Sequence, residues 1–324
     1  MARYIKMSSA DNIEVVGEED ARKLHCASCG IAGLDDIKLT ECNGCDLVRY
    51  CSDECQELHQ PEHAGECKRR AAELRDEILF RQPESRHLGD CPICCLPFPL
   101  DPNQFMLLGC CSKSICAGCV FADRVKEANA RAKCPFCRLP VTQESYQGFF
   151  KRAEANDPSA LQRIGELRFD KGDYESAIKY WTKAAGLGNG DAHYDLFYMY
   201  LKGEGVEMDE EKELYHLEEA AIAGHPFARY NLAMKECVKH NVEREVKHLI
   251  IGANLGSDPS MHILKEHYKN GNITKDDFAA ALRGHHAAVA ETKSQQRKEA
   301  ESAMKGIAEE IRAEEMLKAM MTEL

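Results

Sequence analysis

The cysteines of this chain are numerous and unevenly placed, and their placement constrains the fold more than any other feature. Of 17 cysteines in 324 residues, seven lie between residues 26 and 67, nine lie between residues 91 and 137, and the last is Cys237. The N-terminus shows no secretory signal, and no apolar run approaches the roughly 20 residues that cross a bilayer. We therefore expect a cytoplasmic or nuclear protein without membrane contact, in which the thiols are not paired as disulfides. The clustering predicts metal sites in the first half of the chain and another kind of structure after them.

The first cluster contains four closely spaced pairs of potential metal ligands. They are Cys26 and Cys29, Cys42 and Cys45, Cys51 and Cys55, and His63 and Cys67. Zn²⁺ prefers four tetrahedral thiolate or imidazole ligands, so eight ligands complete two sites. Residues four apart share one face of a helix, which suits the last two pairs. We expect one helix over residues 52–60 and a second short helix that starts at Pro61.

The order and spacing of these ligands, together with Tyr50 and Gln56, resemble the MYND zinc finger, and we place this module at residues 24–68. In that family the two sites interleave. The resemblance implies one zinc on Cys26, Cys29, Cys51 and Cys55, and the other on Cys42, Cys45, His63 and Cys67. His59 stands where the family has a packing histidine, so we assign it to packing rather than to ligation. Gln60 stands where the family often has a Trp, a residue type that commonly anchors bound peptides.

Both zinc ions of this module are expected to be structural. About 40 residues bury too little apolar surface to fold without such help. Eight protein ligands close both coordination spheres, whereas a catalytic zinc keeps one position open for water. We therefore predict no catalytic residue in the first module.

A charged, helix-prone connector is expected over residues 69–88, followed by a second zinc module over residues 89–141. Its four cysteine pairs, which again predict two zinc ions, are Cys91 and Cys94, Cys110 and Cys111, Cys116 and Cys119, and Cys134 and Cys137. Cys110 and Cys111 are adjacent, which strains the backbone when both bind one ion. In the alternative register Cys111 and Lys113 would be the third and fourth ligands, but a protonated Lys113 has no lone pair. We therefore keep the adjacent cysteines together and treat Cys95 as a spare thiol.

The second pattern resembles a RING finger of the all-cysteine variety over residues 91–140. Cross-bracing as in that family would place one zinc on Cys91, Cys94, Cys116 and Cys119, and the other on Cys110, Cys111, Cys134 and Cys137. RING fingers commonly recruit a ubiquitin-conjugating enzyme and act by positioning its thioester. The resemblance implies docking through Ile93, Pro135 and Arg138, with Val120 or Phe121 in place of the usual aromatic residue. The planar guanidinium of Arg138 suits two carbonyl acceptors.

Two functions follow from these modules. In the first, the chain is an adaptor with RING-type ubiquitin ligase activity, which recruits a conjugating enzyme through residues 91–138 and substrates through the MYND finger and the helical repeats. In the second, it is a non-catalytic scaffold, since many RING-like folds bind proteins and ligate nothing. The net charge of −12 counts against a nucleic-acid partner, whose phosphates are bound through Lys and Arg.

The second half of the chain is self-similar. Three similar segments recur: AAGLGNGDAHYDL (184–196), AAIAGHPFARYNL (220–232) and GANLGSDPSMHIL (252–264). Their equivalent glycines, Gly188, Gly224 and Gly256, stand 36 and 32 residues apart. They resemble Sel-one-like repeats, relatives of the tetratricopeptide repeat, with three to four units over residues 156–293. Such stacks commonly bind proteins or peptides on a concave face. Four tyrosines either line that face or, as the simpler assignment, pack within their own repeat: Tyr194, Tyr198, Tyr215 and Tyr230.

The predicted fold class is therefore multidomain, with two small zinc-stabilised modules followed by an all-α helical-repeat solenoid. We assign Trp181 to the core of the repeats, because it falls at helical spacing with other apolar residues. Residues 1–20 are expected to be disordered. Residues 294–324 are expected to form a charged C-terminal helix, with an apolar patch at Met316, Leu317, Met320 and Met321.

Overall fold

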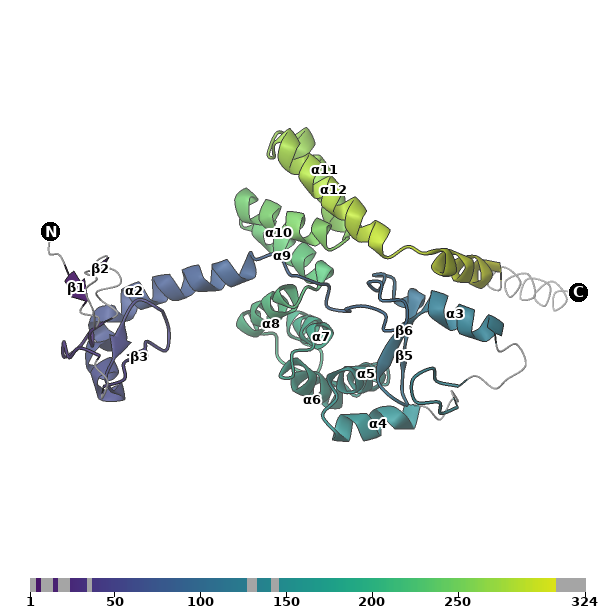
Figure 1. Cartoon of the computed structure of the whole chain (residues 1–324), viewed down its shortest axis with the longest axis horizontal. Coiled ribbons are helices and arrows are strands. Elements are labelled where there is room, and N and C mark those ends of the chain that lie inside the picture. Colours follow the sequence, from purple (N-terminus) through teal and green to yellow (C-terminus); the bar gives the residue numbers. More distant parts are fainter. Residues whose placement is uncertain are drawn as a thin grey trace, which may run out of the picture. The chain divides into compact units, whose positions relative to one another are not determined.

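The computed structural model describes residues 4–6, 14–16, 24–33, 37–126, 133–140 and 146–306. The chain divides into two compact units, residues 1–81 and residues 82–324 (Figure 1). The predicted fold class is confirmed, because two cysteine-rich modules with very short strands precede a series of helices. No helix in the described part of the chain is long and apolar enough to span a membrane.

In its described residues, the first unit contains two short strand pairs and one long helix. Strand β1 (Tyr4–Lys6) pairs antiparallel with β2 (Glu14–Val16), and β3 (Thr40–Glu41) pairs antiparallel with β4 (Arg49–Tyr50). The first pair falls within the 20 residues expected to be disordered, and the other residues of that stretch lie outside the described part. Helix α2 (Asp53–Leu79) follows β4 directly.

Helix α2 differs from the sequence prediction in its continuity and in its end. Ser52 caps its N-terminus by accepting the amide of Cys55, and Pro61 lies inside the helix rather than at the start of a second one. Proline removes one backbone hydrogen bond. Both Pro61 and Glu57, whose carbonyl loses its partner, are exposed, so water can take that place. The helix ends at Leu79, short of the predicted residue 88, because Pro83 disfavours helical backbone in the residue before it.

The second cysteine module is a small hairpin followed by a helix. A single turn of 3-10 helix, η1 (Pro102–Gln104), leads into β5 (Phe105–Leu108), which pairs antiparallel with β6 (Lys113–Cys116), and α3 (Ala117–Lys126) follows. Phe98, Leu108 and Ile115 are buried in its core together with most of its cysteines. So small an apolar core needs the metal sites to hold it.

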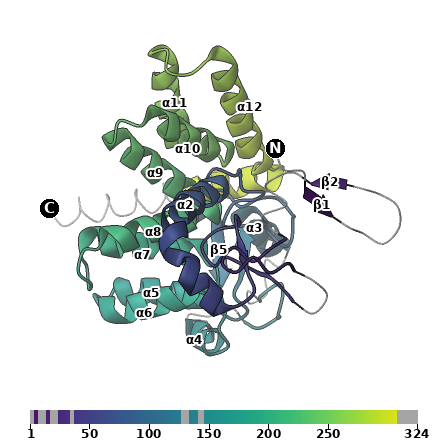
Figure 2. The ribbon, with the colours of Figure 1, turned by 90° about the vertical axis from the view of Figure 1, so that its left-hand side faces the viewer.

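After α4 (Tyr146–Glu154), the helices α5 to α12 form four successive hairpins. Within the hairpins, α5 packs against α6, α7 against α8, α9 against α10, and α11 against α12. Figures 1 and 2 show the hairpins stacked in chain order. Their bounds are α5 (Pro158–Phe169), α6 (Tyr174–Ala185), α7 (Gly190–Lys202), α8 (Glu210–Ile222), α9 (Pro226–Val238), α10 (Val242–Asn254), α11 (Asp258–Lys269) and α12 (Lys275–Glu291).

The three recurring sequence segments coincide with the turns between hairpins. In each turn a glycine has left-handed backbone, with φ of 84°, 85° and 87°. The next residue caps the following helix by accepting the amide three residues on. The glycines are Gly188, Gly224 and Gly256, and the caps are Asn189, His225 and Ser257. The sequence repeat is thus a turn-and-cap unit that starts each new hairpin.

Trp181 lies in the core of the first hairpins, as predicted. Its side chain is 3% exposed, and its indole N–H donates to the carbonyl of Gln162 at 3.1 Å. A Cβ added at Gly165 would lie 2.4 Å from the indole nitrogen, so a glycine is needed where α5 meets this ring.

Two segments distant in sequence lie against the repeats and the second cysteine module. The guanidinium of Arg86 is buried and donates to the carbonyls of Phe98 (3.1 Å) and Ala288. A Cβ added at Gly224 would lie 2.4 Å from the Ser85 carbonyl oxygen, so this connector is in close contact with a repeat turn. The second segment is a helix over residues 295–306, and the residues predicted to form the methionine-rich patch lie outside the described part.

Candidate metal centres

The structure brings together all the expected metal ligands in four groups. Within each group, the ligand atoms lie within 4.8 Å of one another. The groups are Cys26, Cys29, Cys51 and Cys55; Cys42, Cys45, His63 and Cys67; Cys91, Cys94, Cys116 and Cys119; and Cys110, Cys111, Cys134 and Cys137. All seventeen cysteines are free thiols, so none forms a disulfide. The cysteine and histidine clusters are compatible with zinc, as expected.

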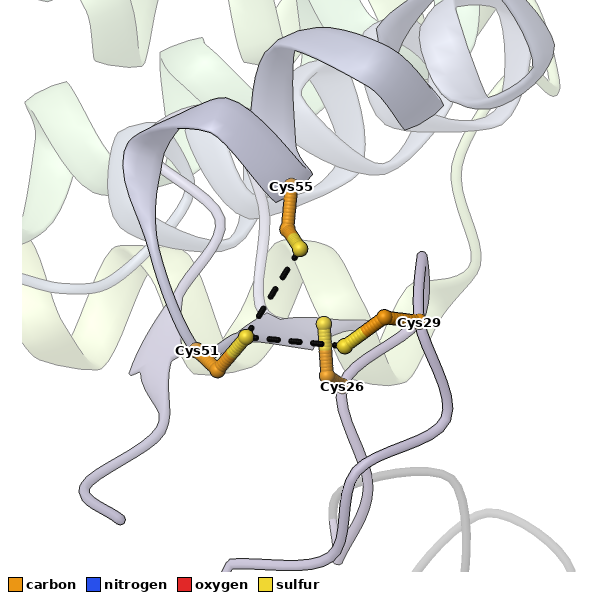
Figure 3. A group of neighbouring side chains, drawn as sticks. All are labelled: Cys26, Cys29, Cys51 and Cys55. Carbon is orange, nitrogen blue, oxygen red and sulfur yellow. Dashed lines mark hydrogen bonds between the residues drawn. The ribbon is translucent and has the colours of Figure 1, made fainter.

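The first group shows how closely these sulfurs fit a metal tetrahedron (Figure 3). The Sγ atoms of Cys29 and Cys51 are 3.6 Å apart, and those of Cys51 and Cys55 are also 3.6 Å apart. Zinc–sulfur bonds of about 2.3 Å give a tetrahedral edge of about 3.8 Å, whereas a disulfide needs about 2.05 Å. The spacing therefore fits four ligands around one ion.

The second group uses the same helix for two of its ligands. Helix α2 carries Cys55 to the first group and both His63 and Cys67 to the second. The Sγ atoms of Cys42 and Cys67 are 3.7 Å apart, and Cys45 Sγ lies 3.2 Å from His63 Nε2. Burial lowers the pKa of His63, which keeps its imidazole neutral and able to ligate.

His59 belongs to neither group. Its Nδ1 is 3.0 Å from the hydroxyl of buried Tyr50, and its ring stacks on that of His63 at a centroid distance of 5.6 Å. Burial and the nearby thiolates raise the pKa of Tyr50 to about 12, so the hydroxyl keeps its proton. His59 thus fills the packing role assigned from the sequence, beside an exposed Gln60.

Three of the cysteine pairs share one backbone turn, a knuckle, over residues 26–32, 91–97 and 134–140. In each knuckle the first cysteine's amide donates to the carbonyl five residues later, at 2.7, 2.9 and 2.8 Å. The residue after the second cysteine has left-handed backbone, with φ of 75°, 55° and 62°. These residues are Gly30, Cys95 and Arg138. Cys95 is therefore the left-handed residue of a knuckle with an exposed thiol, consistent with its assignment as a spare thiol.

The same turns prepare the first cysteine of each knuckle to be a thiolate. Burial would raise the pKa of Cys26, but amide N–H groups including those of Cys29 and Cys51 lower it to about 6. The pKa values of Cys91 and Cys134 are lowered to about 7 by amides in the same way, against burial. The backbone thus stabilises the charge state that zinc requires.

The adjacent cysteines occupy the tip of the β5–β6 hairpin. Residues 109–112 form the turn, where the amides of Cys111 and Ser112 both donate to the carbonyl of Leu108, and Ser112 has φ of 52°. Cys111 Sγ lies 3.7 Å from Cys134 Sγ. Lys113, the rejected ligand, instead places its ammonium over the ring of Phe136, 4.9 Å from the centroid. The tight turn allows two neighbouring thiols to face one site.

Arg297 is a residue of the second module's metal region that sequence reasoning missed. It comes from the helix over residues 295–306 and donates to Cys94 Sγ at 3.4 Å and to the carbonyls of Leu96 and Pro97 at 3.1 and 2.7 Å. Its side chain is buried, and a Cβ added at Gly118 would lie 2.8 Å from its atoms. Because it is about 200 residues from the knuckle at residues 91–97, no spacing pattern indicates it.

The predicted docking residues differ in their exposure. Ile93 is 45% exposed, and Arg138 is also exposed, whereas Pro135 is half-buried. Val120 packs against the module's core, and Phe121 is half-buried. Val125 on α3 and Leu139 beside Arg138 are exposed apolar residues that the sequence analysis did not single out.

Comparison with known proteins supports the first module most strongly. A sequence model of the MYND finger matches residues 26–67, which identifies this segment as a MYND finger. No curated protein sequence matches the chain. Among solved structures, a Sel1 repeat protein from Oxalobacter formigenes is similar at 21% identity, over 46% of this chain and 67% of its own, with a TM-score of 0.39. The protective antigen c5321 of uropathogenic Escherichia coli strains, which displays an SLR fold, is 18% identical over 58% of this chain, with a TM-score of 0.35. The chain covers 39% of that antigen's length.

Proposed function

We propose that the chain is a zinc-dependent protein-interaction adaptor whose second cysteine module recruits a ubiquitin-conjugating enzyme. The observation that carries the proposal is the exposure of Ile93 and Arg138 on two knuckles of the same backbone design. Zinc, when bound, would hold both knuckles rigid, so an apolar contact and a cation are presented at fixed positions. The MYND finger and the repeats would bind the other proteins that the adaptor brings together.

In this role the chain acts by positioning the conjugating enzyme and its ubiquitin thioester. The exposed Ile93 side chain would enter an apolar groove of the conjugating enzyme, and the guanidinium of Arg138 would donate to carbonyl oxygens of the enzyme and of ubiquitin. Holding the thioester in a reactive posture lowers the barrier without a covalent intermediate on this chain. The knuckle thiolates themselves would be engaged by metal and are not nucleophiles.

The test is an autoubiquitination assay with the zinc-loaded full chain and a panel of conjugating enzymes. We expect Ile93→Ala to reduce chain formation by at least about ten-fold, the effect of losing a central contact of about 1.4 kcal/mol. Arg138→Asn removes the cation while keeping a residue that tolerates left-handed backbone. Val238→Ala, at an 81% exposed position of α9, is the matched control and should leave activity unchanged.

A non-catalytic scaffold is the second candidate, and one observation favours it. The chain's own residues already cover parts of the second module. Arg297 contacts the knuckle at residues 91–97. Helix α4 contacts the hairpin tip so closely that a Cβ at Gly148 would be 2.3 Å from the Gly109 carbonyl oxygen. Absence of ubiquitin transfer with every conjugating enzyme in the panel, from protein with its full zinc content, would establish this candidate over the ligase.

A further inference from the structure

A cavity of about 690 Å³ lies between the repeats and the second cysteine module, and neither the ligase nor the scaffold function explains it. The first helices of three hairpins, α5, α7 and α9, line one side. Residues 100–110, which include β5, line the other. The β5 side is mostly apolar, with Leu100, Phe105 and Met106 among its residues. The repeat side is acidic, with Glu166, Asp191 and Asp195.

The repeat side of the cavity, which we call the acidic wall, carries more acidic than basic side chains. The only Arg or Lys among the described residues that line the cavity is Arg163, and its guanidinium already pairs with Glu166. Asp195 accepts a hydrogen bond from the side-chain amide of Gln162, Nε2 to Oδ2, at 3.0 Å. Burial raises the pKa of Asp195 to about 8, with the nearby acids Glu166 and Asp191 adding to the shift. A carboxyl group in this state lacks a cation to stabilise its charged form.

Two histidines face the third acid. His87 Nε2 lies 3.1 Å from Asp191 Oδ1, and His225 Nε2 lies 3.7 Å from the same oxygen. These three groups are close enough to suggest a metal site. However, His225 Nδ1 accepts the amide of Ala228 at 3.2 Å as the cap of α9, so the proton of the neutral ring is on Nε2. A nitrogen that carries a proton cannot ligate, and metal-bound histidines normally donate from their other nitrogen.

His87 adds a second acceptor to the wall. With its Nε2–H directed to Asp191, its Nδ1 keeps a lone pair, and this atom is buried without a hydrogen-bond partner among the described residues. The side chain is only 7% exposed and lines the cavity. A buried acceptor without a donor is unfavourable. His87 Nδ1, which lacks a donor, and Asp195, which has a neutral amide donor but no cation, would therefore both be stabilised by further N–H donors.

We propose that this cavity binds the cationic end of an arginine or lysine side chain from a partner protein. The carboxylates would supply the opposite charge, His87 Nδ1 would accept an N–H, and the apolar β5 wall would contact the aliphatic stem. The molecule already buries Arg86 beside the repeats through backbone carbonyls, so an arginine in such surroundings has an internal precedent. This inference names the ligand class of the repeats and rests on the adaptor half of the proposed function.

The test uses the zinc-loaded full chain and small probes, measured by calorimetry and NMR. Nα-acetyl-arginine amide and Nα-acetyl-lysine amide should bind saturably with a Kd on the order of 1 mM or below. Above the raised pKa of about 8, where Asp195 is ionised, Asp195→Asn should weaken binding about ten-fold, since it removes one charged acceptor. Glu175→Gln is the matched control, because Glu175 is an exposed acid on α6 outside the cavity, and it should bind the probes as the wild type does.

Several results would overturn the proposal. Nα-acetyl-citrulline amide has nearly the shape of the arginine probe without its charge, and equal binding of the two would remove the electrostatic basis. Equal binding by wild type and Asp195→Asn, or no binding of either cationic amide at about 10 mM, would do the same. Spermidine that binds much more tightly than both amides would replace the partner side chain with a free polyamine.

Zinc content decides between the cation and metal interpretations of the histidine pair. The wild type should hold four zinc ions, one for each cysteine-containing group. His225→Asn keeps a good helix cap, as Asn189 does at the equivalent turn, and should not change this number. A fifth ion that is lost in His225→Asn would overturn the proposal. Because probe binding is measured without a conjugating enzyme, failure of the ligase assay would leave this result unaffected.

Discussion

The cysteine modules and the helical repeats lie in one chain but are held together in different ways. In the modules, each group of four ligand atoms gathers within 4.8 Å, and knuckles fixed by local hydrogen bonds present the cysteines. In the repeats, fully buried small residues such as Ala177, Ala192 and Ala228 allow helices to approach closely, and the stability is spread over many contacts. We infer that the modules depend on a few indispensable atoms, whereas the repeats tolerate the loss of any one contact.

Metal removal is expected to have the largest effect and to separate the two regions. A strong chelator should unfold residues 26–67 and 91–140, because structural zinc contributes about 10–16 kcal/mol in finger peptides. The hairpins α5 to α12 should keep their helical circular dichroism. Hydrogen exchange followed by mass spectrometry would locate the change. Equal acceleration of exchange in the hairpins would mean that the repeats also depend on the metal.

A single-thiol substitution sharpens the comparison within the second module. Cys111→Ser should lower the zinc content from four ions to three, because Cys111 is buried in the fourth group. Cys95→Ser is the matched control: it changes a neighbouring exposed thiol outside the groups and should leave four ions. Zinc measured after gel filtration would decide. Four ions in Cys111→Ser would show that the adjacent cysteines do not both ligate.

In the repeats, the largest effect should come from overpacking. Gly165→Ala would bring a methyl group to 2.4 Å from the Trp181 nitrogen, and such overpacking typically destabilises by about 1–3 kcal/mol. Gly186→Ala places its methyl group 3.4 Å from the Thr182 carbonyl oxygen, an ordinary contact, at φ of −61°, and should be neutral or slightly stabilising. Thermal melts of both variants, at unchanged zinc content, would test this. Equal melting temperatures would contradict the close contact.

The acidic cavity predicts a pH effect confined to the repeats' side of the molecule. The folded-state pKa of Asp195 is raised to about 8 from its ordinary 3.8, so the folded state binds a proton that the unfolded state has lost. Stability should therefore fall as pH rises from about 4 to about 8. Asp195→Asn should remove at least about 1.4 kcal/mol of this fall, the equivalent of one pKa unit. Denaturant midpoints of both proteins at several pH values provide the measurement, and parallel pH profiles would refute it.

The smallest expected effect is the loss of one cap in a repeat turn. Asn189→Ala leaves the amide of Ala192 without its side-chain acceptor, which typically destabilises by about 1 kcal/mol. Asn189→Ser restores an acceptor and should recover most of the stability. If the alanine and serine variants melt alike, the turn-and-cap unit contributes less than its recurrence suggests.

The sequence predicted those features that depend on short-range spacing. The pairing of ligands in Cys-x2-Cys and His-x3-Cys patterns reflects turns only a few residues long, and the repeat glycines mark turns in the same way. The C-P-x-C-x-L-P pattern occurs at both residues 91–97 and residues 134–140. This repetition indicates one backbone turn for both segments and identifies Cys95 as a residue of that turn. The continuity of α2 through Pro61 could not be predicted from the sequence, because proline disfavours the interior of a helix on average without forbidding it.

Features that join distant parts of the chain could not be predicted. Arg86 and Arg297 read as ordinary charged residues of a connector and a helix, yet each is buried by residues about 200 positions away. The acids of the cavity lie on α5 and α7, where the sequence alone predicts that they face solvent. Only the placement of β5 opposite them makes a cavity.

Because these contacts join distant parts of the chain, they can form only late in synthesis. The knuckle at residues 91–97 leaves the ribosome about 200 residues before Arg297, and Arg86 precedes Ala288 by a similar interval. At about 5–20 residues per second, the nascent second module waits roughly 10–40 s without the residues that later cover it. During that time its thiols must acquire metal on their own. Early metal loading would then come before closure by the C-terminal half, and a shortage of zinc during translation would expose the module to trapping or aggregation.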